Sequence, residues 1–213
     1  MKKIPPLVIG LLGGIGSGKT ATARWLERRH GATILSADHW GHEALRQPAI
    51  LRAVRRRWPG VVTAGRSPAV DRPRLAALVF SRPTELRTLN ALVHPWIRRA
   101  LQKELRAAVA RGKRLFVLDA AILVEMGLSG LCRLLVFVDA PAPLRARRVA
   151  RDRGWSLAEW RRREKSQWPL ARKKALAHFI LFNRGTPREL SGNLERWWAF
   201  LAATREKTIA PKA

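Results

Sequence analysis

Cysteine is almost absent from this sequence, because Cys132 is the only one among 213 residues. A lone cysteine can form neither an internal disulfide nor a cysteine zinc site. The sequence therefore excludes the disulfide-rich secreted class and favours a reducing cytoplasm as the compartment.

Long hydrophobic runs are missing as well. Nowhere do about 18 consecutive apolar residues occur, which is the length that a membrane-spanning helix needs. The first residues resemble a signal peptide, because Lys2 and Lys3 precede an apolar run. That run leads directly into a glycine-rich motif, so cleavage there would destroy the motif. We therefore expect neither a membrane span nor a cleaved leader.

Acidic residues are scarce, with 15 Asp and Glu against 42 Lys and Arg, and the formal net charge is +27. Such a charge suits anionic ligands, nucleic acid or an acidic surface, but by itself it bears on solubility and steering. The arginines are also spread along the chain and not gathered in one tract. A hydrophobic content of 47% predicts a globular protein, either one large domain or a core with small insertions.

The most informative stretch is Leu7–Thr20, LVIGLLGGIGSGKT. Leu7–Leu12 is apolar and short, which predicts a strand buried on both faces. Ala21–His30 is helix-forming and ends at Gly31, a natural C-cap. Between them lies G-x-x-x-x-G-K-[ST], and the order of strand, glycine loop and helix is the context that a phosphate-binding P-loop requires.

In a P-loop, glycines let successive backbone N–H groups turn inward around an anion, and the helix start adds its positive dipole end. Lys19 is expected to reach the β and γ phosphates, and the Thr20 hydroxyl to ligate Mg²⁺. The predicted ATP-binding residues are Gly13, Gly14, Ile15, Gly16, Ser17, Gly18, Lys19 and Thr20.

Ala32–Leu35 predicts a second strand, which delivers Ser36-Ala37-Asp38 to its carboxyl end. In open parallel sheets ligands bind at that edge, so we expect Asp38 near the P-loop. Asp38 also suits the N-cap of a helix beginning at His39, and capping and catalysis are compatible roles.

The middle of the chain predicts helices. Ile50 to Trp58 is one, Asp71-Arg72-Pro73 starts another, and apolar residues recur at helical spacing from Leu86 to Val109. Pro95 interrupts that last pattern, so it is two helices or one kinked helix. His94 before Pro95 is either functional or a helix-boundary histidine satisfied by its neighbours.

Two further apolar runs, Leu115–Asp119 and Leu134–Asp139, end in aspartate and predict central parallel strands. Either aspartate suits the Walker B role of holding Mg²⁺, and the sequence leaves the choice open. Glu125 follows a second buried run, where an acid is costly unless it is used or exposed.

Pro141 to Arg153 predicts a basic helix, and Ser156 with Glu159 forms a capping box for a helix over Leu157 to Trp168. This pair suits a lid over phosphates, or else a solvated face. His178–Phe182 predicts a last strand, and a closing helix follows from Pro187, with Trp197 inward. The expected fold is α/β, a P-loop NTPase three-layer fold with about five parallel strands and helices on both faces.

The absence of other motifs narrows the possible classes of P-loop protein. No guanine-reading N-K-x-D is present, and no partner motif of motor, helicase or transporter ATPases is visible. Small P-loop kinases fit, because they combine a P-loop, an acid on the second strand and an arginine-bearing lid.

The chain resembles the dephospho-CoA kinase family over about residues 7 to 190. The most specific element after the P-loop is L-N-x-x-x-H-P-x-I, present at Leu89–Ile97. The other ordered matches are Gly13–Thr20, Ser36–Asp38, Asp71–Leu75 with Val79–Phe80, Asp119–Leu128, Arg147 with Arg151–Asp152, and Ser166–Leu170 with Lys173, Ala177 and Asn183.

The chain departs from the family pattern at four positions. Ser36 stands where an acid is usual, and Leu12 replaces a polar residue before the glycines. Both lie near the expected site, so efficiency or acceptor choice is open to change there. Ala121 in place of proline and His178 in place of aspartate look structural.

The resemblance implies transfer of the γ-phosphate of ATP, with Mg²⁺, to the ribose 3′-hydroxyl of dephospho-CoA. It implies catalytic roles for Asp38, Lys19 and Arg147, and acceptor binding by Asp38, Arg72, His94 and Leu123. It further implies a kinase core over 1–47 and 112–205 with a lid at about 141–169, a helical acceptor domain over 48–111 and a tail over 206–213.

Two other functions remain as alternatives. One is a P-loop kinase for a different nucleoside-like small molecule, which the Ser36 and Leu12 departures favour. The other is a nucleic-acid-dependent ATPase, suggested by the charge and nine tryptophans. Against it, most tryptophans fall at helical core positions and no RRM, KH or helix-turn-helix motif is visible. ATP and dephospho-CoA are therefore the expected partners, without nucleic acid or membrane.

Overall fold

The computed structural model describes residues 5–204. The chain forms two compact units, unit 1 up to Leu35 and from Leu105 onward, and unit 2 over Ser36–Glu104. Unit 2 therefore begins earlier in the chain than the helical insertion expected over 48–111. The expected tail, residues 206–213, lies outside the described residues.

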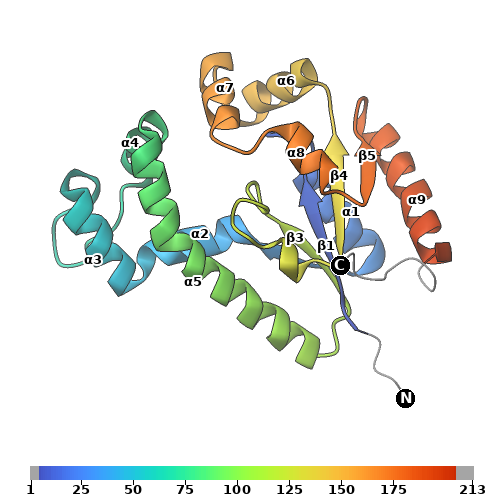
Figure 1. The fold of residues 1–213 in the computed structure, drawn as a ribbon, viewed down its shortest axis with the longest axis horizontal. Coiled ribbons are helices and arrows are strands. Elements are labelled where there is room, and N and C mark those ends of the chain that lie inside the picture. Colours follow the sequence, from blue (N-terminus) through green and yellow to red (C-terminus); the bar gives the residue numbers. More distant parts are fainter. Residues whose placement is uncertain (1–4, 205–213) are drawn as a thin grey trace. The chain divides into compact units, whose positions relative to one another are not determined.

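Unit 1 is built on a five-stranded sheet in the order β2-β3-β1-β4-β5 (Figure 1). β1 pairs in parallel with β3 and with β4, and β4 pairs in parallel with β5. All five strands lie where the sequence predicts them, within a residue or so. Their bounds are Leu7–Leu12 for β1, Thr33–Ser36 for β2, Leu115–Asp119 for β3, Leu134–Asp139 for β4 and Phe179–Phe182 for β5.

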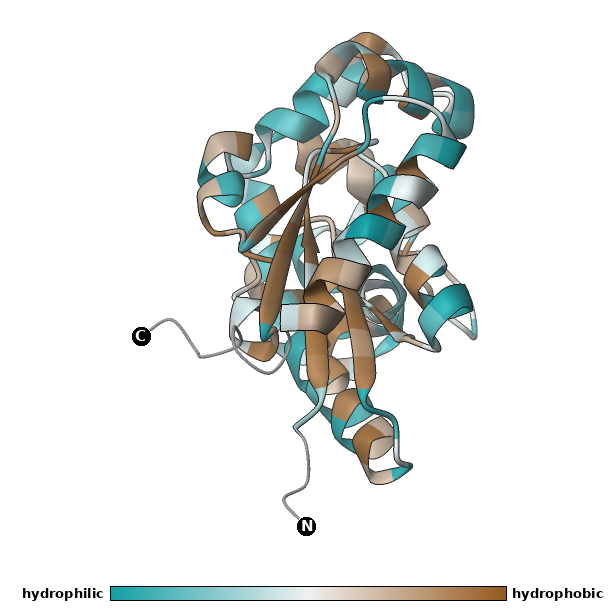
Figure 2. Cartoon of the chain, turned by 90° about the vertical axis from the view of Figure 1, so that its right-hand side faces the viewer, coloured by the Kyte–Doolittle hydropathy of each residue, from teal (hydrophilic) through white to brown (hydrophobic). Residues whose placement is uncertain are grey.

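Apolar side chains on both faces of β1 explain why this strand lies at the centre. All six of its residues are buried, and the strands form the most hydrophobic part of the chain in Figure 2. Leu7, Ile9 and Leu11 belong to one core cluster, which also contains buried residues of α1 (Lys19–His30) and α9 (Pro187–Thr204). Those two helices therefore cover one face of the sheet.

On the opposite face, Gly10 leaves room for a close approach. A Cβ atom at Gly10 would lie 2.7 Å from Cys132 Sγ and 3.0 Å from a methyl group of Leu123. The absence of a side chain at Gly10 thus lets the segment after β3 pack directly onto β1. Burial raises the pKa of the Cys132 thiol to about 12, so this cysteine stays a neutral thiol near neutral pH.

Three helices lie between β4 and β5, and the first two fall in the part predicted as a lid. They are α6 (Ala142–Arg153), α7 (Leu157–Lys165) and α8 (Leu170–Ala175). The Ser156 hydroxyl accepts a hydrogen bond from the Glu159 N–H at 3.2 Å, as the capping box predicts. The predicted helix to Trp168 is wrong at its end, because Pro169 disfavours helical geometry at Trp168. The Trp168 N–H instead donates to Glu125 Oε1 at 2.9 Å.

Unit 2 is helical. Its elements are α2 (Ala37–Arg46), α3 (Pro48–Arg57), a 3-10 turn (Pro59–Val61), α4 (Arg72–Ser81) and α5 (Pro83–Ala110), whose last turns belong to unit 1. Of the two outcomes left open at Pro95, the structure has one continuous helix. Glu85 joins α5 to the end of α3, since it accepts from Arg57 at 2.6 Å and from Trp58 Nε1 at 2.7 Å.

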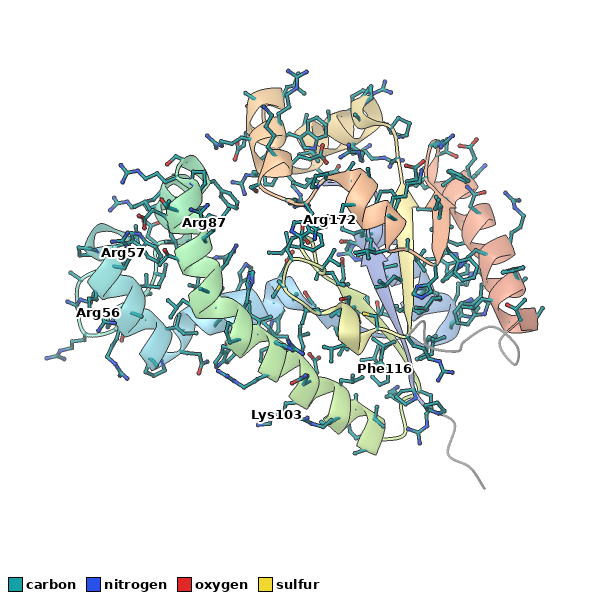
Figure 3. The ribbon with its side chains drawn as sticks, viewed as in Figure 1. Arg56, Arg57, Arg87, Lys103, Phe116 and Arg172 are labelled. Carbon is teal, nitrogen blue, oxygen red and sulfur yellow. The ribbon has the colours of Figure 1, made fainter. Side chains whose placement is uncertain are left out.

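These helices carry many basic side chains. Arg56 and Arg57 lie on α3 and Arg87 lies on α5, all in unit 2 (Figure 3). No helix among residues 5–204 is both long and apolar enough to cross a membrane.

Candidate active site

The predicted P-loop, residues 13–20, connects β1 to α1 at the carboxyl edge of the sheet. In the β1–β3 pairing Leu11 is level with Asp119, so the loop starts beside the last residue of β3. Gly16 and Gly18 have φ angles of 81° and 102°, which L side chains rarely adopt. A Cβ at Gly16 would also lie 2.6 Å from the Arg145 carbonyl oxygen. Glycine is thus required at both positions by backbone geometry, and at Gly16 also by contact with α6.

Lys19 is the first residue of α1, and its side chain folds back over the loop. Its ammonium Nζ donates to the carbonyl oxygens of Gly13 at 3.0 Å and Gly14 at 2.9 Å. Loop amides and a helix N-terminus are the groups with which a P-loop binds phosphate. The positive charge of Lys19 therefore lies where a phosphate-binding loop uses it.

A hydroxyl and a carboxylate meet next to the loop. Thr20 Oγ1 donates a hydrogen bond to Asp119 Oδ2 at 2.9 Å, although the two residues are far apart in the sequence. These are the donor types that Mg²⁺ takes in P-loop proteins, where few protein ligands are completed by nucleotide oxygens and water. The pair therefore fits a magnesium ion.

The other candidate aspartate has a different partner. Asp139 Oδ2 accepts from Arg184 Nη2 at 2.8 Å. Of the two aspartates, Asp119 is therefore the one bonded to the P-loop, through Thr20, whereas Asp139 is bonded to Arg184 after β5. The sequence alone could not make this choice, since both runs end in aspartate.

Arg147, the predicted lid arginine, lies on α6. It is exposed, and it has no hydrogen bond or ion pair to any residue in the described range 5–204. Its neighbour Arg148 is bonded instead, with Nη2 donating to Asn183 Oδ1 at 3.1 Å and to the Gly185 carbonyl at 3.0 Å. Burial lowers the pKa of Arg148, and the charge of Arg151 lowers it further.

Two buried cations in unit 1 were not assigned a role by sequence reasoning. Arg145 is 4% exposed and forms an ion pair with Glu164, and its guanidinium lies 5.1 Å from the Trp160 ring centre. Lys173 is 1% exposed and pairs with Glu125 at 2.8 Å. Glu125 is thus used, as its buried position requires.

The sequence pointed to one of these two cations but not to the other. Lys173 lies in a motif shared with the resembling family, whereas Arg145 was indistinguishable from its exposed neighbours. Nearby arginines use tryptophan rings in a similar way, since Arg163 lies 4.1 Å from the Trp155 ring centre and Arg172 lies 3.5 Å from that of Trp168 (Figure 3 labels Arg172). Such contacts hold long basic side chains in place.

In unit 2, the capping role considered for Asp38 is wrong. Helix α2 begins at Ala37, and the cap is Ser36, whose Oγ accepts from the His39 N–H at 3.2 Å. Asp38 lies in the first turn and is exposed. The helix therefore starts earlier than the sequence predicts, because the serine hydroxyl satisfies an N–H group there. The Ser36 departure keeps the cap, since serine and aspartate are both good caps.

The predicted acceptor residues differ in their surroundings. Arg72 Nη2 lies 2.5 Å from His42 Nε2 beside a pocket of about 250 Å³ within unit 2. Burial lowers the pKa of His42, and the charge of Arg72 acts in the same direction. His94 is half-buried in α5. Leu123 belongs to unit 1 and is 1% exposed, so it offers no surface to a ligand in this structure.

The fold and this edge of the sheet define a class. A P-loop after the central strand of a parallel sheet, with a threonine and a carboxylate beside it, is the nucleotide site of P-loop NTPases and kinases. The basic helices α6 and α7 pack on this loop, where Arg145 and Trp160 bond the Ile15 carbonyl.

Comparison with known proteins identifies the family. The family model described as "Dephospho-CoA kinase" matches residues 7–189. A dephospho-CoA kinase from Chlorobaculum tepidum is 36% identical over 211 residues, covering 97% of this chain and 100% of the relative. One from Deinococcus radiodurans is 37% identical over 190 residues, covering 89% and 90%. The chain belongs to the dephospho-CoA kinase family and is a kinase.

Solved structures agree with the fold. A Thermus thermophilus protein superposes with a TM-score of 0.75 at 36% identity, covering 96% of this chain and 100% of its own. The dephospho-CoA kinase from Campylobacter jejuni gives a TM-score of 0.66 at 20% identity, covering 93% and 98%. The five-stranded P-loop architecture of unit 1 is thereby confirmed.

Proposed function

We propose that the P-loop edge of unit 1 transfers the γ-phosphoryl group of ATP to the ribose 3′-hydroxyl of dephospho-CoA, giving coenzyme A and ADP. ATP-dependent phosphorylation of dephospho-CoA is the activity of the family to which the chain belongs. The observation that carries the assignment is the meeting of Lys19, Thr20 and Asp119 around one loop.

Phosphoryl transfer is mostly positioning and charge stabilisation, which defines what each residue contributes. The loop amides of residues 13–20 and the Lys19 ammonium hold the β and γ oxygens. Thr20 and Asp119 would hold Mg²⁺, which supplies neutralisation of the charge on the phosphate oxygens.

Asp38 is proposed to orient the acceptor hydroxyl and accept its proton, since a carboxylate is basic enough for this and the capping task belongs to Ser36. Arg147 is proposed to place positive charge over the transferring group. Its support is that the side chain is exposed and makes no hydrogen bond or ion pair within residues 5–204.

Unit 2 is proposed to bind the acceptor, with Arg72 and His94 contributing. Arg72 and His42 line a pocket with cationic character, which suits the pyrophosphate of dephospho-CoA. Leu123 contributes only by packing in the core, given its burial. Residues 141–169 are proposed to close over ATP and exclude water. A reducing cytoplasm remains the proposed compartment.

The test is an acceptor panel. ADP formation by the full chain with MgATP is measured alone, with dephospho-CoA, with other nucleosides and with RNA, and the product of each productive reaction is located by phosphorus NMR. We expect strong stimulation by dephospho-CoA and a new 3′-phosphate. Stimulation by another nucleoside or by RNA, without stimulation by dephospho-CoA, would overturn the proposed acceptor.

A further inference from the structure

The carbonyl groups of the P-loop need hydrogen-bond donors as much as its amides need an anion. When the N–H groups of a loop turn inward around an anion, its carbonyls turn outward, and buried carbonyls need donors. Two carbonyls of this loop find donors on other elements. Ile15 O accepts from Arg145 Nη1 at 3.3 Å and from Trp160 Nε1 at 3.4 Å, and Ser17 O accepts from Asn183 Nδ2 at 2.7 Å.

These donors are held firmly by their own contacts. Arg145 Nε donates to the Ala140 carbonyl at 3.1 Å, and its guanidinium pairs with Glu164 and stacks on Trp160. The guanidinium is thus bonded through Nε and Nη1, and α6 and α7 are tied to the same loop carbonyl.

Asn183 is fixed in the same way from a different direction. It follows β5 and is 3% exposed, and its Oδ1 accepts from Arg148 Nη2 on α6 at 3.1 Å. The backbone N–H of Asn183 donates to the Asp139 carbonyl at 2.8 Å. Its amide is thereby oriented with the Nδ2 group toward the loop.

We propose that Arg145, Trp160 and Asn183 form a carbonyl clamp that fixes the inward orientation of the P-loop amides and so sets the affinity for phosphate. They are positioning residues, because they act through the loop backbone and do not touch the nucleotide phosphates. Arg145 is the principal member, since it also carries the ion pair to Glu164. The inference rests on the proposed ATP site but does not depend on the acceptor.

A purely structural role for Arg145 makes a different prediction. Replacing both members of a buried ion pair with apolar residues of similar volume is often neutral or stabilising, whereas removing one leaves a buried charge. The double variant Arg145→Leu/Glu164→Leu therefore removes the clamp donor while sparing stability. The single variant Arg145→Leu confounds the two effects.

The experiment compares ADP with adenosine, which lacks phosphate, as ligands of the full chain in the presence of Mg²⁺. Calorimetry gives the Kd of ADP, and ligand-detected NMR titration gives the Kd of adenosine. In the double variant we expect ADP to bind about tenfold more weakly, the scale of one lost charged hydrogen bond. Adenosine affinity and the melting temperature should stay near the wild-type values.

Three further variants sharpen the result. Asn183→Asp removes the Nδ2 donor and keeps an oxygen for Arg148, so it should also weaken ADP selectively. Trp160→Phe removes a long bond of 3.4 Å and should have a smaller effect of the same kind. Arg153→Leu is the matched control on the same helix, because Arg153 also stacks on a tryptophan, Trp155, at 5.0 Å but has no contact with the loop.

The outcomes are decisive in either direction. Selective loss of ADP affinity in the double variant and in Asn183→Asp, with Arg153→Leu unchanged, supports the clamp. Unchanged ADP affinity in the double variant, or equal weakening of ADP and adenosine, overturns it. Because no acceptor is present, a wrong assignment of dephospho-CoA would leave this result intact.

Discussion

The two faces of α6 use arginine in opposite ways. On the inner face Arg145 and Arg148 are hydrogen-bonded to the P-loop and to Asn183, respectively. On the outer face Arg147 and Arg151 are exposed, and Arg151 bonds the adjacent Asp152 at 2.7 Å. Residues three or four apart are neighbours on a helix, so Arg148 lies between Arg145 and Arg151 around α6, and Arg147 lies beside Arg151. One helix thus combines a fixed support and a free positive surface.

This difference also governs how firmly each arginine keeps its proton. Burial lowers the pKa of Arg148, whereas the hydrogen bond that Arg151 donates to Asp152 raises the pKa of Arg151 and lowers the pKa of Asp152. All these groups stay charged near neutral pH. The arginines of α6 therefore differ in their hydrogen bonds and in their exposure to solvent. They do not differ in charge, so a count of basic residues does not distinguish them.

The largest loss of activity is expected for substitution of Lys19. This residue lies on α1, outside both faces of α6, and its effect is the reference for the α6 variants. Lys19→Ala should lower phosphoryl transfer by more than about 10³-fold, because it removes the positive charge at the transferred group. Circular dichroism and the melting temperature should stay near wild type, since the Lys19 ammonium is hydrogen-bonded to the Gly13 and Gly14 carbonyls of its own loop and is not part of the hydrophobic core. An unfolded variant, or one with most of its activity, would contradict the assignment.

Arg147→Ala tests the outer face. We expect kcat to fall by up to about 10³-fold while the KM for ATP changes little, because the charge is needed most as the phosphoryl group transfers. Steady-state kinetics with both substrates varied gives the two constants. An equal loss in binding and rate would make Arg147 a ground-state clamp and would erase the distinction between the faces.

Asp38→Asn comes next in size and separates chemistry from helix capping in unit 2. We expect kcat to fall by about 10²-fold, the scale of losing a positioned base. The melting temperature should barely change, because Ser36 and not Asp38 caps α2. Ser36→Asp should not restore activity in the Asp38→Asn background. Near-full activity of Asp38→Asn with dephospho-CoA would remove Asp38 from the mechanism while leaving the family assignment intact.

The smallest effect is expected from Arg153→Ala at the end of α6. Its guanidinium lies 5.0 Å from the Trp155 ring centre and makes no contact with the loop, so kcat and the KM for ATP should stay within about twofold. A loss comparable to that of Arg147→Ala would mean that the outer face acts as one cationic surface.

Much of unit 1 was predictable from the sequence because its signals are local. Buried parallel strands appear as short apolar runs, and the glycine loop between β1 and α1 has a fixed pattern. Gly31 ends α1 in the left-handed conformation with φ of 65°, as expected of a C-cap glycine.

The parts that could not be predicted depend on contacts between distant residues. The proposal of Asp119 for the metal rests on its hydrogen bond to Thr20 and on that of Asp139 to Arg184, and the buried Arg145 contacts Glu164 and the loop. The start of α2 was misplaced because Ser36 and Asp38 are both acceptable caps. Helix boundaries and ion-pair partners are decided by tertiary packing, which periodicity does not encode.

The most direct test of this account measures kcat and the KM for ATP for Arg147→Ala and for Arg145→Leu/Glu164→Leu side by side, with saturating dephospho-CoA. The account predicts a split: Arg147→Ala lowers kcat with a nearly unchanged KM, and the double variant raises the KM about tenfold with a smaller change in kcat. If both variants change the same constant by the same factor, the two faces of α6 have no separate roles and the account is contradicted.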